Sequence, residues 1–399
     1  MRRRRATALA TLLALGAALA VVAAAYATPE RAAAPSAQAG SDAALVKCGK
    51  TRTIGFMAPV TGPAASIGIQ QVHWAQYYVS TYNKTHKTKF KLQTEDTQLG
   101  APTGTAEALK GAQALAGSSN VLGVVGPAGS NEIVGVTKSL MDGGLAWVSG
   151  SSTRTSLTTD GTRTGYMFRT VPPDAIQGPT AANFILKKLK YTRVYIIDDQ
   201  ETYSTGLADA VQQVLKAAGA TVNRDGVSQQ QSDFSSLIAK IPRDTQIVYI
   251  PWQLPPKGQA FGNQMKAAGK GTIKLMGADG LYDSSFASVG AHVYDTNFPL
   301  NPKSKIIAGF KKGHGGDGEY FGAPTYAATQ VVGNAIDRAC AKGSTTRAAV
   351  RAAIRSTKIP AAQSLIGVAI RFNRNGDLST LHKFGLYKSN GTVFVPIAG

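Results

Sequence analysis

The chain alternates short apolar runs with longer amphipathic runs, in two successive series that span residues 53–141 and 175–268. This alternation is the βα rhythm of a parallel sheet covered by helices. Runs such as Val194–Ile197 and Ile247–Ile250 are apolar throughout, which is typical of strands buried on both faces. Two such series predict an α/β protein with two doubly wound, Rossmann-like lobes. A ligand would bind in the cleft between them, outside the carboxyl ends of the strands.

The two lobes are expected to be joined by a three-segment hinge. The chain would cross near Val171–Pro173, Asn297–Pro302 and Phe372–Asn373. The first lobe would comprise residues 48–172 and 301–372, and the second residues 173–300 and 373–399. Asn375–Gly376 is also expected to turn a hairpin between the apolar runs Val368–Phe372 and Phe384–Tyr387.

Residues 1–27 differ from the rest of the chain. Four consecutive arginines precede an apolar run from Ala6 to Ala25, and Ala25-Tyr26-Ala27 has the small-x-small pattern of a cleavage site. These features predict a signal peptide and therefore export. An uncleaved membrane anchor is the alternative, because about 20 apolar residues can cross a bilayer. Residues 28–47, rich in Ala, Pro and Ser, are expected to form a flexible linker.

The chain is strongly basic, with a formal net charge of +20 that includes four leader arginines. Its cationic residues are not interleaved with aromatic residues, which argues against a nucleic-acid partner. We expect them on solvated faces; they include Lys187, Lys188, Lys190, Arg193, Lys311, Lys312, Arg347, Arg351 and Arg355.

The chain has two cysteines, Cys48 and Cys340. In an exported protein they suggest one disulfide, worth on the order of 4–5 kcal/mol in the loop-entropy model because it would close nearly the whole chain. Two buried free thiols are the alternative.

Two segments of small polar residues each follow a strand-like run. Gly126–Asn131 follows Val121–Val125, and Ser149–Thr153 follows Gly144–Val148. A turn of this kind, opening onto a helix at Ser130, presents a hydroxyl and free backbone N–H groups to an anion. A carboxylate is the expected anion, since no metal-binding or nucleophilic residue stands nearby in the sequence.

These segments resemble the leucine-binding family of type I periplasmic substrate-binding proteins, which serve ABC transporters. The resemblance covers most of residues 50–399. Ile54–Pro63 is similar to the family's opening strand and turn, Phe168–Asp174 to its segment entering the second lobe, and Tyr203–Ala208 to its second-lobe loop and helix start. The resemblance implies the type I periplasmic-binding fold, closed by a hinge.

The resemblance also implies roles for residues of the first lobe. Ser130 and Thr153 would donate hydrogen bonds to a ligand carboxylate, with Gly129 in the same turn. Ser151 would offer its backbone carbonyl to the ligand's ammonium group. Ser130 is open to a second interpretation, since serine commonly caps helices.

In the second lobe, the resemblance places Asp279 against the ligand's ammonium group and Tyr203 over the cleft. An Asp-Gly turn is the alternative for Asp279. The side-chain end of the pocket departs from the family, with Ile67 in place of an aromatic wall and Trp252 and Gln253 in place of a Gly- and Tyr-rich loop. Leucine specificity is therefore not carried over; Gln253 would favour a polar ligand, and Trp252 fits ordinary packing equally well.

The sequence contains no Gly-x-Ser-x-Gly, phosphate-loop or His-Glu-x-x-His motif, and its histidines occur singly. We expect no enzyme, no cofactor and no metal site. The expected function is that of an exported binding protein, which captures a small amino-acid-like ligand and delivers it to an ABC permease. The alternatives are a receptor for an amide, urea or aromatic carboxylate, a ligand sensor for an envelope receptor, and an exported hydrolase of small amides.

Overall fold

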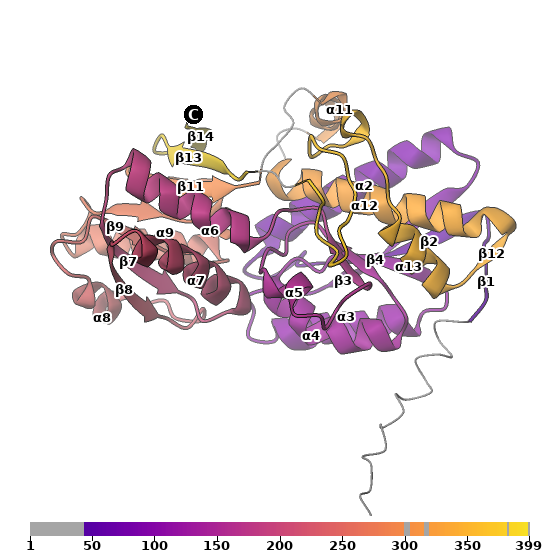
Figure 1. Ribbon diagram of the computed structural model, residues 1–399, viewed down its shortest axis with the longest axis horizontal. Coiled ribbons are helices and arrows are strands. Elements are labelled where there is room, and N and C mark those ends of the chain that lie inside the picture. The colour runs from indigo at the N-terminus through magenta and orange to yellow at the C-terminus, as the bar shows by residue number, and fades with distance from the viewer. Residues whose placement is uncertain (1–43, 299–303, 315–318, 381–382, 398–399) are drawn as a thin grey trace, which may run out of the picture. The chain divides into compact units, whose positions relative to one another are not determined.

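The computed structural model describes residues 44–298, 304–314, 319–380 and 383–397. The predicted signal peptide and most of the predicted linker lie outside these ranges. The described chain forms two main β-sheets, each with helices on both faces, and one short two-stranded sheet (Figure 1). The predicted α/β architecture with two doubly wound units is confirmed.

The first sheet has five parallel strands in the order β3-β2-β4-β5-β6. Its strands are β2 (Thr51–Ala58), β3 (Lys89–Asp96), β4 (Val121–Val125), β5 (Trp147–Ser149) and β6 (Met167–Arg169). The helices associated with it are α2 (Ala65–Thr85), α3 (Gly104–Gly117), α4 (Ser130–Asp142), α5 (Ser156–Thr159), α11 (Lys305–His314), α12 (Glu319–Ala339) and α13 (Arg347–Arg355).

Alternate residues of β2 face opposite sides of this sheet. Ile54 and Phe56 pack with α2, α12 and α13, where Trp74 stacks on Phe310 at 3.9 Å between ring centroids. Met57 faces the other side and packs with α3 and α4. Burial on both sides explains why β2 carries no polar side chain from Ile54 to Ala58.

The second sheet has seven strands in the order β14-β13-β11-β10-β9-β7-β8. Its parallel strands are β7 (Arg193–Asp198), β8 (Thr221–Gly226), β9 (Ile247–Tyr249), β10 (Lys274–Met276) and β11 (Val293–Asn297), and the antiparallel pair β13 (Gly385–Ser389) and β14 (Phe394–Pro396) follows at one edge. Its helices are α6 (Asp174–Asn183), which the π-helical turn η1 (Phe184–Lys188) continues, α7 (Thr202–Ala217), α8 (Ser235–Lys240), α9 (Pro255–Ala267) and α10 (Ser284–Ala287).

The run Val194–Ile197 alternates between the faces of the second sheet as the sequence predicted. Val194 and Ile196 pack with α6 and α7, whereas Tyr195 and Ile197 pack with α8 and α9. The carboxyl ends of β9 and β10 lead directly into Gln253 and Asp279, so the sheet positions two of the predicted site residues.

The turn at Asn375–Gly376 differs from its prediction. It does not join the two apolar runs into a hairpin; an isolated bridge pairs Phe372 with Leu378, and the hairpin is β13–β14 instead. The carbonyl of Gly376 accepts a hydrogen bond from the backbone N–H of Arg169 in β6. Residues expected at the start of the second lobe therefore contact the first sheet, because the chain continues along it beyond residue 373.

Cys48 and Cys340 form a disulfide, with Cα atoms 5.7 Å apart. It lies beside the small antiparallel sheet that β1 (Val46–Lys47) makes with β12 (Ser344–Thr345). Val46 and Lys47 were expected in the linker; pairing with β12 makes them part of the folded chain instead.

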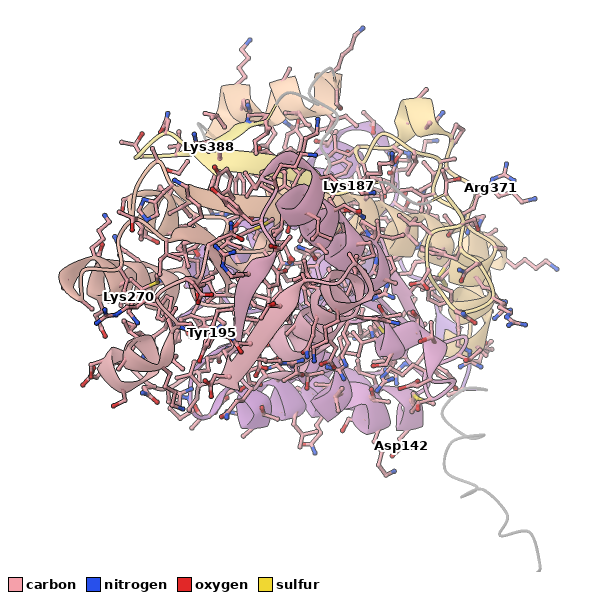
Figure 2. All side chains as sticks on the ribbon, turned by 60° about the vertical axis from the view of Figure 1, so that its left-hand side comes forward. Asp142, Lys187, Tyr195, Lys270, Arg371 and Lys388 are labelled. Carbon is pink, nitrogen blue, oxygen red and sulfur yellow. A yellow bond between two sulfur atoms is a disulfide. The ribbon has the colours of Figure 1, made fainter. Side chains whose placement is uncertain are left out.

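The cationic residues predicted on solvated faces are exposed, such as Lys187 on η1 (Figure 2), except for two of them. Arg351 is half-buried, with its guanidinium 4.1 Å from the centre of the Tyr166 ring. The prediction for Arg347 is wrong, because its side chain is buried and donates to three carbonyls at the ends of α3 and α4 and to that of Val121 in β4. Carbonyls at helix ends lack helical partners and carry negative partial charge, so they favour a buried cation there.

Candidate functional site

The two polar segments of the first sheet lie side by side, because β4 and β5 are parallel neighbours. Serine hydroxyls tie them together: Ser149 Oγ donates to the Pro127 carbonyl at 2.8 Å, and Ser151 and Ser152 donate to the Ala128 carbonyl at 2.8 and 2.9 Å. The hydroxyls of the second segment thus hold the first segment in place.

Gly126 is required at the start of the first segment. Its φ is +95°, and a Cβ there would lie 2.1 Å from the carbonyl oxygen of Met57. No side chain fits so close to a neighbouring backbone. The close approach of β2 therefore dictates glycine at this position.

Helix α4 begins at Ser130 and supplies the anion-binding end of the site. The Ser130 side chain is buried, and its Oγ accepts a hydrogen bond from the Arg154 backbone N–H at 3.3 Å. Among the described residues its hydroxyl proton has no acceptor, and the first N–H groups of a helix have no helical partner. These donors, at the positive end of the helix dipole, suit a carboxylate.

Glu132 caps the same helix, since its Oε2 accepts the Gly129 N–H at 2.6 Å. Burial raises the pKa of Glu132 to about 7, against the opposing effect of the hydrogen bond from the Gly129 N–H. Partial protonation near neutral pH reduces its repulsion of an anion at the helix start.

Asp279 supplies a carboxylate from the second sheet, at the start of the 3₁₀ turn η2 (Asp279–Leu281) that follows β10. Its Oδ1 accepts hydrogen bonds from Gln177 Nε2 at 2.6 Å and from the Tyr203 hydroxyl at 2.8 Å. Burial raises the pKa of Asp279 to about 6, although both hydrogen bonds act against the increase. The side chain is 3% exposed, so its negative charge is poorly solvated and would be stabilised by a cation.

Two further carboxylates lie buried near Asp279. Both oxygens of Asp174 and of Asp295 lack a hydrogen-bond partner among the described residues. Burial raises the pKa of Asp174 to about 7, and it raises that of Asp295 well above its usual range. In each case the charge of Asp279 adds to the increase, so the neutral, protonated form of both groups is favoured, and neither residue lines the pocket.

One pocket contains both ends of the site. Its lining comes from loops of both sheets and from α2, α7 and α12: Ile67, Leu99, Ala128, Gly129, Ser130, Ser151, Tyr203, Gln253, Asp279, Gly280 and Phe321. The lining joins apolar side chains with a few polar groups, which is typical of a site for a small ligand.

Seven of the nine predicted site residues line this pocket: Ile67, Gly129, Ser130, Ser151, Tyr203, Gln253 and Asp279. Trp252 does not. Its ring packs with Phe234 and Phe261 in the core of the second sheet, and its Nε1 donates to the Ile197 carbonyl at 2.8 Å. Trp252 therefore has the ordinary packing role that the sequence left open as an alternative.

Thr153 also lies outside the pocket lining. It is completely buried, and its carbonyl accepts the Asp174 N–H at 2.8 Å. The Thr153 hydroxyl is buried and has no hydrogen-bond partner among the described residues. Its expected contact with a ligand carboxylate stays a prediction.

Sequence reasoning missed Leu99, Ala128, Gly280 and Phe321. Leu99 follows the end of β3, so the rule that ligands bind at strand ends could have identified it. Ala128 and Gly280 adjoin predicted residues. Phe321 comes from α12, far along the chain, and no local pattern distinguishes it.

Hydrogen bonds also join the two sides of the cleft near the pocket. The Arg154 guanidinium donates to the carbonyl of Thr202 and, at 3.0 Å, to Thr205 Oγ1 at the start of α7. Gln230 Nε2 donates to the Gly100 carbonyl at 3.1 Å. Loops of the two sheets thus meet around the site.

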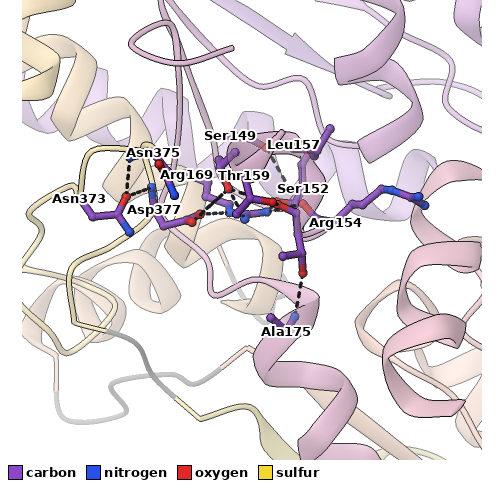
Figure 3. A network of polar contacts seen from close by, with 12 residues as sticks. Ser149, Ser152, Arg154, Leu157, Thr159, Arg169, Ala175, Asn373, Asn375 and Asp377 are labelled. Atoms are coloured by element: carbon purple, nitrogen blue, oxygen red, sulfur yellow. Dashed lines mark hydrogen bonds and ion pairs between the residues drawn. The ribbon is translucent and has the colours of Figure 1, made fainter. Parts of the chain in front are cut away.

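A network of polar contacts supports the segment Ser149–Arg154 (Figure 3). Arg169 is completely buried and donates through NH1 to the carbonyls of Ser152 at 3.2 Å and Arg154 at 2.9 Å. Its Nε donates to Asp377 Oδ1 at 2.6 Å. The backbone of the binding segment is therefore held by a buried ion pair.

Within the described ranges, no three His, Cys, Asp or Glu side chains come together in a way that could hold a metal ion. None of the helices in those ranges has the length and apolar character needed to cross a membrane.

The sequence profile of the periplasmic binding protein family matches residues 51–391. A Leu/Ile/Val-binding protein of Rhizobium johnstonii is 32% identical over 352 residues, which cover 84% of this chain and 91% of that protein.

Solved structures show the same fold. A leucine-binding protein of Thermotoga maritima superposes with a TM-score of 0.75 at 22% identity, covering 87% of this chain and 98% of that one. A branched-chain amino acid transporter substrate-binding protein of Streptococcus pneumoniae, in complex with isoleucine, gives a TM-score of 0.72 at 20% identity, covering 87% and 100% of the two chains. With its matching profile, its two mainly parallel sheets and its interlobe pocket, the chain belongs to the periplasmic binding protein family.

Proposed function

We propose that this protein binds a free amino acid between its two lobes and delivers it to an ABC permease in the membrane. One observation carries the proposal: a single pocket is lined both by Ser130, at the anion-binding start of α4, and by the buried carboxylate of Asp279. A zwitterion of amino-acid size meets both requirements.

The ligand carboxylate would bind at the start of α4. Ser130 Oγ would donate one hydrogen bond, and the free N–H groups of the first helical turn would donate others. Charge-assisted hydrogen bonds of this kind contribute about 1.5–3 kcal/mol each. The packing of the Ser149–Thr153 segment against Ala128 supports this role, because it fixes the loop that leads into the helix.

The ligand ammonium group would pair with Asp279, with the Ser151 carbonyl as a second acceptor. Tyr203 would cover the ligand from the second lobe while its hydroxyl remains bonded to Asp279. An aromatic carboxylate or a urea has no cation to pair with Asp279, and it would leave that charge buried without a partner. The site therefore favours an amino acid over these alternatives.

Hinge closure would complete the site. We assign residues 44–170 and 304–380 to the first lobe and residues 174–298 and 383–397 to the second. The division of the lining between the two supports this assignment, with Ser130 in the first and Asp279 in the second. A ligand that contacts both lobes stabilises the closed state, and only such differential binding shifts the population.

Relatives named as ABC transporter substrate-binding proteins support delivery to a permease. These relatives are binding proteins of transporters, and we infer a binding role without catalysis for this chain as well. Export would depend on residues 1–27 acting as a signal peptide, in keeping with a periplasmic family.

Calorimetric titration of the purified protein with amino acids, each paired with its deaminated and decarboxylated analogues, tests the proposal. We expect at least one intact amino acid to bind and both of its analogues to bind far more weakly. If the deaminated analogue binds as tightly as the intact amino acid, the role of Asp279 is contradicted. If the decarboxylated analogue does so, the role of Ser130 is contradicted.

A further inference from the structure

Gln253 brings a carboxamide with incomplete hydrogen bonding into the pocket. The side chain is 4% exposed, and its Nε2 donates to Asn131 Oδ1 at 3.3 Å. Its Oε1 is buried and has no hydrogen-bond partner among the described residues. Gln253 is the one pocket-lining residue in those ranges whose side chain includes such an atom.

The orientation of this carboxamide follows from its neighbours. The amide nitrogen of Gln253 faces Asn131 Oδ1, so the hydrogen bond between them occupies the nitrogen end of the carboxamide. The oxygen end, Oε1, remains the free acceptor.

The position of Gln253 is also fixed at the backbone. Its N–H donates to Asp199 Oδ2 at 3.3 Å, and the same oxygen accepts Gln229 Nε2 at 3.0 Å. Asp199 and Glu201 do not line the pocket, and Asp199 accepts hydrogen bonds from the Glu201 backbone N–H and from Gln229 Nε2. The polar group that this side of the pocket presents to a ligand is therefore the neutral carboxamide oxygen of Gln253. A neutral acceptor does not require a cationic side chain on the ligand.

The remaining walls near the ligand's side chain are apolar. Ile67, Leu99 and Phe321 line the pocket and belong to one buried apolar cluster. None of them offers a hydrogen bond to Gln253 Oε1. A ligand ending in a methyl group would separate this acceptor from water without replacing the lost hydrogen bond, whereas a hydroxyl or amide would satisfy it.

We propose that the pocket selects amino acids whose side chain carries a neutral hydrogen-bond donor, a hydroxyl or a carboxamide, and that Gln253 Oε1 accepts this hydrogen bond. The inference rests on the proposed function, which holds the ligand's carboxylate and ammonium groups at Ser130 and Asp279. A site with a buried acceptor of this kind discriminates against the isostere that lacks the donor.

Isosteric pairs test this inference in calorimetric titrations of the purified protein. L-Threonine is compared with L-valine, and L-asparagine with L-leucine. We expect the polar member of at least one pair to bind ten times more tightly or better. Gln253→Leu should remove or reverse that preference, and Gln253→Met, which keeps the side-chain length, repeats the test.

Gln230→Leu is the matched control. It makes the same chemical change at another glutamine that hydrogen-bonds across the cleft, yet Gln230 does not line the pocket. We expect the preference to survive in this variant.

Each contrary outcome has a distinct meaning. If valine and leucine bind as tightly as their polar isosteres, the inference fails and the amino-acid function stands. A preference that survives in both Gln253 variants overturns the assignment to Gln253. If no amino acid binds, the proposed function fails as well.

Discussion

Arg169 and Asp377 form a buried ion pair, with Nε and Oδ1 2.6 Å apart, although 208 residues separate them in the chain. Thr158 Oγ1 lies 3.0 Å from each oxygen of Asp377 and accepts a hydrogen bond from Arg169 NH2 at 2.8 Å. The same guanidinium holds the carbonyls of Ser152 and Arg154 (Figure 3). The pair thus connects a C-terminal turn to the segment that we propose contacts the ligand.

Removing one partner of the Arg169–Asp377 pair should destabilise the fold. We expect Arg169→Met or Asp377→Leu alone to reduce the free energy of unfolding by about 3–5 kcal/mol, because each leaves a buried charge unpaired. The double variant should lose less than the sum of the two, as urea titrations would show. Arg193→Met, at an exposed ion pair with Asp244, is the control and should cost at most about 1 kcal/mol. Additive losses in the double variant would contradict the coupling.

Ser130→Ala should weaken ligand binding by about 1–3 kcal/mol and leave the fold intact, because it removes one donor to the proposed carboxylate. Ser139→Ala makes the same change near the other end of α4 and should leave the affinity unchanged. Calorimetry with the best-binding amino acid measures both. An unaltered affinity in Ser130→Ala would mean that the serine only shapes the helix start.

Ligand affinity should fall as the pH falls through about 6. The Asp279 carboxyl has a pKa of about 6 in the folded protein, and only its ionised form pairs with an ammonium group. Between pH 7.5 and pH 5 the ionised fraction drops about tenfold, so we expect an affinity loss of about that size. Asp279→Asn should bind weakly at both pH values, while Asp233→Asn, on the exposed surface, should behave like the wild type. A pH-independent wild-type affinity would refute the pairing.

The free energy of unfolding of the ligand-free protein should rise as the pH falls, whereas ligand affinity should fall. Burial raises the pKa of Asp174 and of Glu132 to about 7, above the value of about 4 expected in the unfolded chain. Between these values the folded state binds more protons than the unfolded state, so stability rises as the pH falls. From pH 7.5 to 5.5 we expect a gain of roughly 1–2 kcal/mol for each group, measured by urea unfolding. Asp174→Asn should flatten the profile; a wild-type stability that decreased over this range would contradict the expectation.

Loss of the disulfide should affect stability without affecting binding. Cys48 and Cys340 close a loop spanning 292 residues, so replacing both with alanine should reduce the free energy of unfolding by up to about 5 kcal/mol. Neither residue lines the pocket, and ligand affinity should stay the same. Unfolding with and without a reductant gives an independent measurement. A weakened affinity at unchanged stability would be the contrary result.

Most of the secondary structure could be predicted from local patterns. The expected strand Val121–Val125 matches β4, and the helix expected from Ser130 to Met141 matches α4 to within one residue. Such elements follow from apolar periodicity and from turn residues that adjoin in sequence. The turn at Asn375 was assigned the wrong partners, because several strand-like runs compete for the same neighbour and periodicity does not choose among them.

The candidate site could be predicted in part for the same reason. Ser130, Ser151 and Asp279 follow strand ends, and all parallel strands of a sheet end at the same edge. Trp252 follows a strand as well, yet its ring turns into the core, since a single residue of register decides which way a side chain points. Phe321 joins the pocket from a distant helix that no local motif identifies.

The sequence by itself determined the two βα series, the carboxyl-end loops and the chemistry those loops present, because these depend on residues close together in the chain. Only the tertiary structure decided that Arg169 meets Asp377, that Arg347 is buried against helix ends, and that Gln253 keeps one oxygen without a partner. These relationships depend on how helices, strands and loops that are far apart in the sequence pack against one another. Packing is set by the summed fit of many side chains, which no single stretch of sequence contains.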